Sequence, residues 1–299
     1  MNIDYEYLSK IRRAVALYTK KKTSNILDGD FHSIHKGRSM EFDDLKEYTV
    51  GDDVHDIDWK SSSRMGTILV RRYVTDKRHN VMFVCDCGRK MLGDTPSGES
   101  KSELALMTFG TIAYITGRNG ADFALAYPGN ERSSISFFKS GPEHLEALIY
   151  DYEKHVEIDG KITLEQTLKN VTAAVNKRMI IVVISDMEGI AGISEGVMRS
   201  VSSEHDLLAI GIEDAMLTGG EVFDSDLGKY EKRFLSFNDK LHELEVGERN
   251  RVIDAVSTAT KQSKVSLVSI SSQSEIIDNV IGLFERYRHG NYGYIKTTV

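Results

Sequence analysis

Residues 81–86, VMFVCD, and residues 179–186, MIIVVISD, decide the fold class of this chain. Each stretch is a short, nearly continuous apolar run that ends in an aspartate, Asp86 in the first and Asp186 in the second. Runs of this length without polar alternation are typical of strands buried on both faces, as in parallel sheets covered by helices. We therefore expect two central strands, each with a carboxylate at its carboxyl end.

Helical and extended patterns alternate around these two runs. Apolar periodicity predicts helices at residues 102–117, 144–154, 163–177, 193–201, 240–262 and 274–288. Further strands are expected at residues 121–128, 134–140, 206–212 and 264–270, with a turn and hairpin in 216–238. Such alternation predicts an α/β fold with a doubly wound, mostly parallel, Rossmann-like sheet and right-handed crossovers.

The first part of the chain does not follow this alternation. A helix is expected over residues 4–21, and mixed short extended segments and turns follow, with a strand over 67–75. The expected organisation is therefore a segment 1–78 with an N-terminal helix and a small β-containing elaboration, a main domain 79–290, and a tail 291–299.

Composition restricts the classes of function. The chain has 299 residues, 40% hydrophobic and 28% charged, with a formal net charge of −7. An acidic protein of this kind is not expected to track nucleic acid, whose partners are usually basic. The sequence contains no apolar stretch long enough to span a membrane, and its first residues have no signal-peptide core, so a cytoplasmic location is expected.

Asp86 and Asp186 predict a site at the carboxyl edge of the sheet. In doubly wound sheets, ligands bind beyond the carboxyl ends of the strands, where the strand order reverses. A carboxylate at the end of a buried strand is costly without a partner for its charge. Two convergent carboxylates suggest a hard divalent cation held by oxygen ligands.

The segment before the first buried strand carries a long signature. Residues 37–73 read GRSMEFDDLKEYTVGDDVHDIDWKSSSRMGTILVRRY, and they resemble the signature of the domain of unknown function 58 family. The matching positions include Glu41, Tyr48, Gly51, Asp52, Asp53, Asp58, Trp59 and Arg64. The family pairs this signature with a von Willebrand factor A-like domain, and the resemblance covers roughly residues 35–285.

The resemblance implies a metal-ion-dependent adhesion site, from which this sequence departs. The implied ligand positions are Asp86, Thr163 and Asp186, but Gly88 and Lys90 stand where hydroxyl residues are expected. Glycine offers no side-chain oxygen and lysine offers a cation. Three interpretations remain open: a degenerate site in which the Lys90 ammonium replaces the metal, weak Mg²⁺ binding, or an unrelated loop.

A second acidic cluster lies in DDVHDIDW, residues 52–59. Asp52, Asp53, His55, Asp56 and Asp58 could serve a metal-dependent hydrolase. The structural alternative is that Asp side chains of the Gly51-Asp52-Asp53 turn bind backbone amides two residues on, and that nearby arginines, Arg64, Arg71 and Arg72, form ion pairs. Trp59 is expected to anchor this segment in the core.

The two cysteines, Cys85 and Cys87, lack the spacing of a redox or zinc motif, and we expect one thiol to pack in the core and the other to lie near the strand end. Basic residues in the helix 4–21 fit either a solvated face or docking to an acidic partner or an anionic membrane surface.

The leading hypothesis is a bacterial, non-enzymatic interaction module. The resemblance implies partnership with a MoxR-type AAA+ ATPase and a protein client, in assembly or maturation of other proteins. No cofactor is expected, with weak Mg²⁺ as the alternative. The competing functions are the metal-dependent hydrolase and a membrane-surface scaffold.

Overall fold

The protein is described from a computed structural model, which places Ser9 and residues 40–75, 80–156, 161–218, 221–224, 227, 229–232 and 239–294. Apart from Ser9, the helix expected over residues 4–21 lies outside these described residues, so its role stays a prediction.

The main sheet forms from the apolar runs of the sequence. Within the described residues it has seven strands: β3 (Asn80–Cys85), β4 (Asp122–Tyr127), β5 (Ser134–Ile135), β6 (Ile180–Asp186), β7 (Asp206–Ile212), β10 (Ser266–Ile270) and β11 (Gly293–Tyr294). Every residue of β6 and β7 is buried, as the continuous apolar pattern of a doubly covered strand predicts.

The strand order is β11-β10-β7-β6-β3-β4-β5. All neighbouring pairs are parallel except β4 with β5, which is antiparallel. Counted along the chain, this is the doubly wound order 3-2-1-4-5-6 with one further strand at the edge. The predicted fold class, an α/β fold with a mostly parallel sheet, is confirmed, and the order reverses between β3 and β6.

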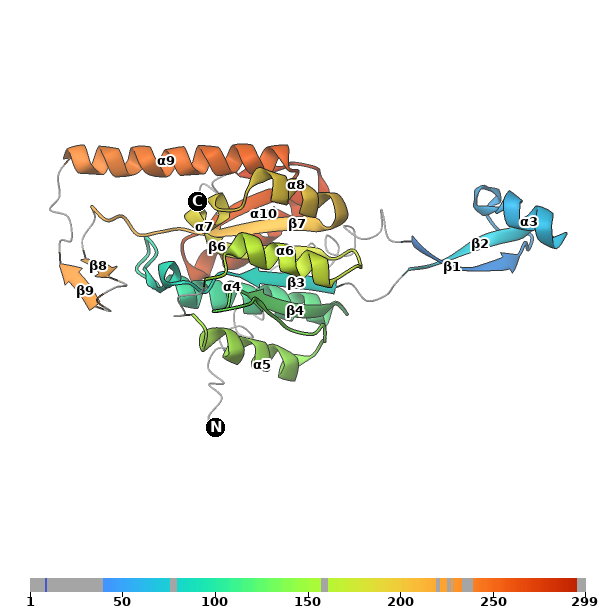
Figure 1. Ribbon diagram of the computed structural model, residues 1–299, viewed down its shortest axis with the longest axis horizontal. Helices are drawn as coiled ribbons and strands as arrows, with labels where there is room; N and C mark the ends of the chain where they lie inside the picture. Colours follow the sequence, from blue (N-terminus) through green and yellow to red (C-terminus); the bar gives the residue numbers. More distant parts are fainter. Residues whose placement is uncertain are drawn as a thin grey trace.

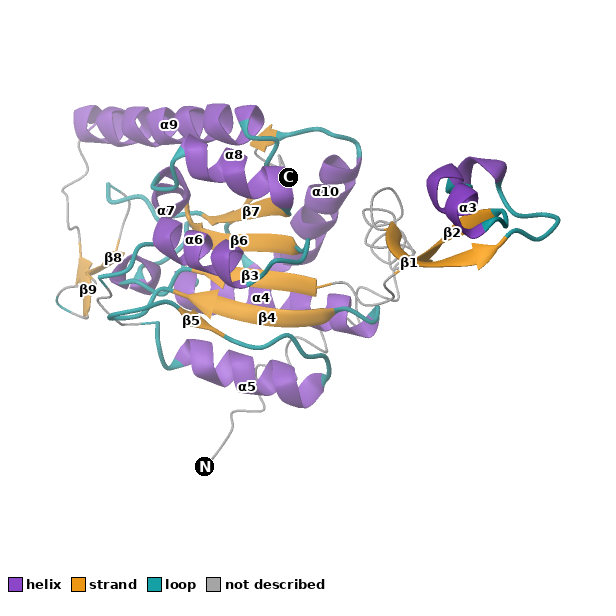
Figure 2. Cartoon of the chain, turned by 45° about the vertical axis from the view of Figure 1, so that its right-hand side comes forward, coloured by secondary structure: helices purple, strands orange, loops and turns teal. Residues whose placement is uncertain are grey.

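Helices cover both faces of the sheet (Figure 2). One face packs against α4 (Lys101–Arg118), α5 (Pro142–Glu153) and α10 (Ile276–Arg288). The other packs against α6 (Leu164–Ala174), α7 (Met187–Ala191), α8 (Glu195–Glu204) and α9 (Asp239–Gln262). Two hydrophobic cores result, one on each side of the sheet.

Helix α4 lies at the centre of its layer. It packs against β3 and β4 and lies between α5 and α10, which explains why its sequence is apolar on nearly every side. Phe109 of α4 meets Phe83 of β3 edge-to-face, with ring centroids 4.9 Å apart. The burial of α4 extends to its first residue, Lys101, which is 3% exposed.

A small unit formed by residues 40–75 precedes the sheet. Strand β1 (Met40–Glu47) pairs antiparallel with β2 (Leu69–Thr75), and the connection holds the 3-10 helix η1 (Val54–Asp56) and helix α3 (Trp59–Met65). Gly66 ends α3 in the left-handed conformation, with φ 75°. Figure 1 draws this unit, in blue, away from the seven-stranded sheet.

Two features near the C-terminus extend the sequence-based expectations. The expected hairpin is present as β8 (Glu221–Asp224) paired with β9 (Lys229–Lys232). Gly293–Tyr294, which we placed in the tail 291–299, pairs in parallel with β10 as the edge strand.

The domain boundary that we expected at residue 78 falls in a stretch that is not described and stays a prediction. Nowhere in the described ranges does a helix combine the length and apolar character of a membrane span.

Candidate functional site

The candidate site lies where the strand order reverses. β3 and β6 are neighbours, with Cys85 opposite Ile184, and Asp86 directly follows β3 while Asp186 ends β6. Both aspartates therefore reach the same carboxyl edge of the sheet, as the sequence predicted. This is the place where doubly wound sheets bind ligands.

Asp86 is held by hydrogen bonds from its own neighbourhood. One carboxylate oxygen accepts a hydrogen bond from the Ser185 hydroxyl at 2.7 Å, and the other accepts one from the Gly88 amide at 3.1 Å. The Tyr152 hydroxyl donates to the Asp86 carbonyl oxygen. Hydrogen bonds from Ser185 and Gly88 therefore orient the Asp86 carboxylate.

Asp186 is 2% exposed and has two partners. Its Oδ1 accepts a hydrogen bond from the Gly189 amide at 2.7 Å and so caps helix α7, where a carboxylate is favoured by the exposed amides of the first turn. Its Oδ2 lies 3.3 Å from the Lys101 ammonium. The charge at the end of β6 is therefore neutralised by a buried lysine.

Lys101 also donates to Asp214, which follows β7. Burial raises the pKa of Asp214, while the Lys101 ammonium opposes that effect. Arg249 of α9 donates to the Asp214 carbonyl oxygen at 2.6 Å and to the Ala215 carbonyl oxygen. An ionic chain therefore connects the end of β6, the start of α4 and the loop after β7.

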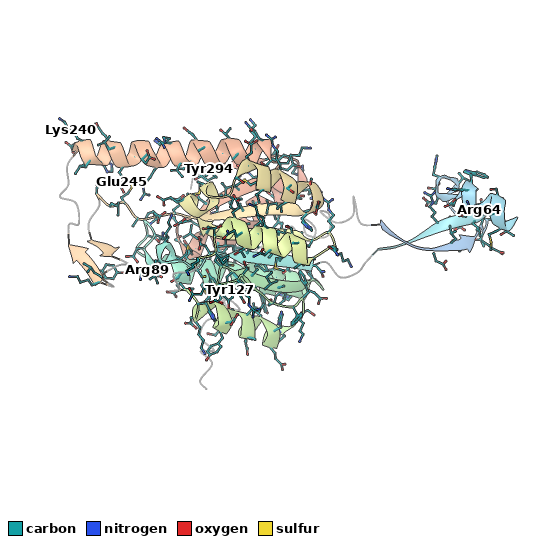
Figure 3. The ribbon with its side chains drawn as sticks, in the orientation of Figure 1. Arg64, Arg89, Tyr127, Lys240, Glu245 and Tyr294 are labelled. Atoms are coloured by element: carbon teal, nitrogen blue, oxygen red, sulfur yellow. The ribbon has the colours of Figure 1, made fainter. Side chains whose placement is uncertain are left out.

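The loop after β7 is also tied to α9 further along. Glu245 accepts hydrogen bonds from the Leu217 amide at 2.6 Å and from the Thr218 amide at 3.0 Å. Figure 3 labels Glu245 near the end of α9 that extends past the sheet. Hydrogen bonds with α9 side chains therefore hold the loop after β7 along residues 214–218.

Gly189 explains how closely the carboxylates converge. A Cβ atom at this position would lie 2.0 Å from Ser185 Oγ, 2.9 Å from Asp86 Oδ2 and 3.2 Å from Asp186 Oδ1. All three oxygens therefore surround one point, which only a glycine leaves open. The convergence that the two strand ends predicted is real.

The other expected site residues lie elsewhere. Thr163 is the N-cap of α6: its hydroxyl accepts from the Gln166 amide, and the Gln166 side chain accepts from the Thr163 amide. No contact joins Thr163 to Asp86 or Asp186 among the interactions of the described residues.

Lys90 lies at the exposed rim of the site. Its ammonium donates to Glu188 at 2.9 Å, and both side chains are more than half exposed. The hydrogen bond to Glu188 is the main reason that the pKa of Lys90 is raised, with smaller effects from Asp186 and Asp86. The ammonium in contact with Asp186 belongs to Lys101, which the sequence analysis did not select.

The donor set does not fit a divalent cation. Mg²⁺ prefers six oxygen ligands in octahedral geometry. Here Asp86 and Asp186 supply carboxylates, Gly88 and Lys90 supply no side-chain oxygen, and the Lys101 ammonium contacts Asp186. Across the described ranges, His, Cys, Asp and Glu side chains form no group of three that could hold a metal ion.

The acidic cluster at residues 52–58 has structural partners. Asp53 caps η1 by accepting from the His55 amide, two residues on, as the turn interpretation predicted. Asp58 caps α3 by accepting from the Ser61 amide and pairs with Arg71 at 3.2 Å. The carboxylates therefore serve the local fold.

Asp52 completes this pattern. It accepts from the Lys46 ammonium at 2.6 Å and from the Thr49 amide and hydroxyl. These hydrogen bonds, that of Lys46 first, lower the pKa of Asp52 to about 2. A carboxylate held ionised in this way is a poor general acid at neutral pH.

The remaining signature residues define the small unit. Glu41 lies in β1 opposite Val74, the Tyr48 amide donates to the Ile68 carbonyl oxygen at 2.8 Å, and Gly51 has φ 111°. Arg64 lies in the last turn of α3 and is labelled in Figure 3.

Trp59 corrects a prediction. It was expected to anchor the segment in the core, but it is 68% exposed at the first position of α3. Among the side chains of the small unit whose burial is described, Ser62, Leu69 and Val70 are buried, and Trp59 is not.

Trp59 belongs to a group of apolar side chains that the small unit leaves in solvent. We call them the exposed apolar set: Val50, Val54, Trp59, Met65 and Ile68, which are 48–100% exposed. Large exposed apolar groups concentrated in one short segment are typical of interaction sites.

Comparison with known proteins gives a family and distant relatives. The model of the family "Protein of unknown function DUF58" matches residues 44–219. Uncharacterized protein Rv1480 of Mycobacterium tuberculosis and uncharacterized protein Mb1516 of Mycobacterium bovis are each 22% identical over 215 residues, 71% of this chain and 67% of theirs.

Solved structures show similar arrangements. The conserved hypothetical protein BatB from Bacteroides thetaiotaomicron aligns with TM-score 0.47 and 12% identity, covering 71% of this chain and 99% of that one. The SpRpn10 VWA domain aligns with TM-score 0.39 and 14% identity, covering 67% and 94%.

Proposed function

Because this chain belongs to the DUF58 family of proteins of unknown function, we propose that it is a non-enzymatic, von Willebrand A-like interaction module. In this proposal it acts in the cytoplasm with a MoxR-type AAA+ ATPase in the assembly or maturation of a client protein. The family resemblance of the signature segment is the reason for choosing this class of partner.

The exposed apolar set carries the proposal. Trp59 is 68% exposed and Met65 is 72% exposed, both on α3 within the family signature. Exposing an indole ring to water is unfavourable, and tryptophan is among the residues most enriched at the centres of protein interfaces. A partner surface that covers α3 would bury both side chains.

The charges of the same segment describe the partner surface. Asp44, Glu47 and Asp53 are exposed residues of the same small unit. We expect the complementary surface of the ATPase to present an apolar pocket with lysine or arginine at its rim, because opposite charges at an interface rim speed association and fix its orientation.

The candidate site between the carboxyl ends of β3 and β6 supports a non-catalytic role. In this proposal it is a degenerate metal-ion-dependent adhesion site, in which lysine ammonium groups accompany Asp86 and Asp186 in place of a metal. The contacts of Asp186 with Lys101 and Gly189, and of Asp86 with Ser185, support this assignment.

A pull-down tests the proposal. The tagged 299-residue chain is incubated with a MoxR-type AAA+ ATPase of the same organism, with and without ATP. We expect the unaltered chain to recover the ATPase, and the double variant Trp59→Ala, Met65→Ala to lose it. Phe137→Ala is the matched control, because Phe137 is 84% exposed but lies outside the signature segment.

Two results would contradict the proposal. Recovery of no ATPase by the unaltered chain, in either nucleotide state, removes the partnership. Equal recovery by the Trp59, Met65 double variant removes the exposed apolar set as the contact surface.

A further inference from the structure

We infer that this chain forms a two-fold dimer, in which the exposed face of α9 packs antiparallel against the same face of a second copy. The inference goes beyond the proposed function, because it concerns neither α3 nor the site between β3 and β6.

Helix α9 extends past the sheet, and Lys240 lies at its projecting end (Figures 1 and 3). One side of the helix packs on the fold: Val256 and Thr260 are buried, and α9 contacts α7, α8 and β11. The opposite side, which we call the outer face of α9, is formed by residues at intervals of three and four, and all of them are exposed: Lys240, Glu243, Leu244, Gly247, Asn250, Arg251 and Asp254.

Gly247 lies in the middle of the outer face. A Cβ at this position would meet no atom of the described residues within 4 Å. Glycine inside a helix is destabilising relative to alanine, and the described fold gives no packing reason for it. A glycine does allow a second helix to approach closely, because no side chain stands between the two backbones. Leu244, which is 69% exposed beside Gly247, would be covered by that helix.

The charges of the outer face are arranged symmetrically about Gly247. Lys240 and Asp254 lie seven residues before and after it, and their charges are opposite. Glu243 and Arg251 lie four residues before and after it, and their charges are also opposite. When two copies of α9 cross antiparallel at Gly247, Lys240 meets the partner's Asp254. Glu243 then meets the partner's Arg251, so every such contact joins opposite charges.

This charge complementarity identifies the partner as a second copy of the chain. In a two-fold dimer the same surface supplies both halves of the interface, which is what the outer face of α9 provides. A parallel pair of helices would instead align like charges. Arg251 also lies 3.6 Å from Glu248 of its own helix, but this pair is well exposed and does not prevent Arg251 from contacting a partner.

Sedimentation equilibrium of the 299-residue chain tests the inference. The protein is measured at up to about 300 μM in about 50 mM and about 500 mM salt, because a small polar interface is weak and salt screens exposed charges. We expect a monomer–dimer equilibrium whose Kd rises at least about fivefold at the higher salt concentration. A chain that is monomeric at both salt concentrations would overturn the inference.

Charge reversals test the antiparallel orientation. Glu243→Arg and Arg251→Glu each place like charges opposite each other, so each should weaken dimerisation at least about tenfold. The double variant restores opposite charges and should return the Kd to within about threefold of that of the unaltered chain. Glu204→Arg makes the same change of charge on α8 and is the control, which should leave the Kd unchanged. If the single reversals leave the Kd unchanged, or if the double variant does not recover dimerisation, the inferred interface is wrong.

Gly247→Gln separates dimerisation from folding. The glutamine side chain would hold the two helices apart, while glutamine favours the helix more than glycine does. We therefore expect this variant to be monomeric, with a urea midpoint at or above that of the unaltered chain. A Gly247→Gln chain that dimerises with an unchanged Kd would exclude close approach of the two helices at Gly247.

Discussion

The ammonium of Lys101 lies 3.3 Å from the carboxylate of Asp186, and the two side chains are 4% and 2% exposed. At the exposed rim of the same site, the Lys90 ammonium lies 2.9 Å from the Glu188 carboxylate, and these side chains are 59% and 64% exposed. The two ion pairs border the same site and differ mainly in their contact with water. They form a natural pair for comparing buried and exposed charges.

Replacing the buried lysine should cost far more stability than replacing the exposed one. Lys101→Met leaves Asp186 and Asp214 without their cation, and breaking a buried pair typically costs about 3–5 kcal/mol. Lys90→Met removes a solvated pair, which costs about 1 kcal/mol or less. Urea unfolding of both variants measures the difference. Equal losses would mean that Lys101 is not buried as described.

Gly189→Ala should disrupt the site directly. The new methyl group would lie 2.0 Å from Ser185 Oγ and 2.9 Å from Asp86 Oδ2, distances that force these groups apart. We expect a loss of several kcal/mol, in the range of overpacking and broken buried hydrogen bonds. The measurement is the urea midpoint of full-length protein.

Gly196→Ala is the matched control for Gly189→Ala. Gly196 lies in α8, and nothing lies within 4 Å of the position its Cβ would take. Alanine in a helix is favoured over glycine by about 0.5–1 kcal/mol, so this variant should be slightly more stable. If Gly196→Ala also lowered the urea midpoint, the loss of stability in Gly189→Ala could not be assigned to the crowding around Gly189.

The sheet was predictable because its two central strands are continuous apolar runs that end in aspartate. VMFVCD and MIIVVISD are typical of strands buried on both faces, and their terminal aspartates meet at one edge because the strands are parallel neighbours. Gly293–Tyr294 escaped prediction because two residues cannot show a period. The strand expected over residues 134–140 is regular only at Ser134–Ile135, and its pairing with β4 continues irregularly through the Ser136 amide and an isolated bridge at Lys139.

The residues of the site were only half predictable. Asp86 and Asp186 follow from strand ends, but Lys101 reaches Asp186 from the first turn of a helix after an irregular loop. The one sequence signal was a lysine directly before a predicted helix, residues 102–117, that is apolar on nearly every side. The prediction that Trp59 is buried in the core was wrong for a related reason. A hydrophobic side chain predicts burial, but it does not predict which surface covers that side chain.

His205 should make stability depend on pH. It is 3% exposed, and neither ring nitrogen has a hydrogen-bond partner within the described residues. Burial lowers its pKa from the ordinary 6.5, with Glu204 and Asp206 opposing and Arg178 assisting. Because the unfolded chain then binds the proton more tightly, the stabilising contribution is complete above the ordinary pKa and is lost as the pH falls below it.

His205→Leu isolates that effect. The unaltered chain should unfold at lower urea at about pH 5.5 than at about pH 8, and the variant should show a smaller difference because its buried side chain does not titrate. Buried carboxylates such as Asp214 also titrate, so the comparison between the two proteins is the relevant quantity. An unchanged pH difference in the variant would exclude His205 as a contributor.

Cys85 and Cys87 should be inert in the native protein. Both thiols are buried, and burial raises the pKa of Cys87 to about 12 and that of Cys85 well above its ordinary value. Since the thiolate is the reactive form, labelling by a disulfide reagent should be at least about a thousandfold slower than for a free thiol.

Labelling in urea should follow unfolding, because unfolding exposes both thiols. A Ser200→Cys variant, with its new thiol on the exposed side of α8, should label at once without urea. Rapid labelling of the unaltered chain under native conditions would restore a reactive role for these cysteines.

Trp59 offers a direct optical test of the surface on which the proposed function depends. It is the single tryptophan of the chain and is 68% exposed, so its emission should resemble that of tryptophan in water and be readily quenched by acrylamide. Trp59→Ala should change stability by no more than about 0.5 kcal/mol, because an exposed side chain loses little on truncation. Adding the ATPase should then shift the emission to shorter wavelength and reduce quenching, since an apolar pocket would replace water around the indole. Protection from quenching before any partner is added would mean instead that the small unit already packs its tryptophan against another part of this chain.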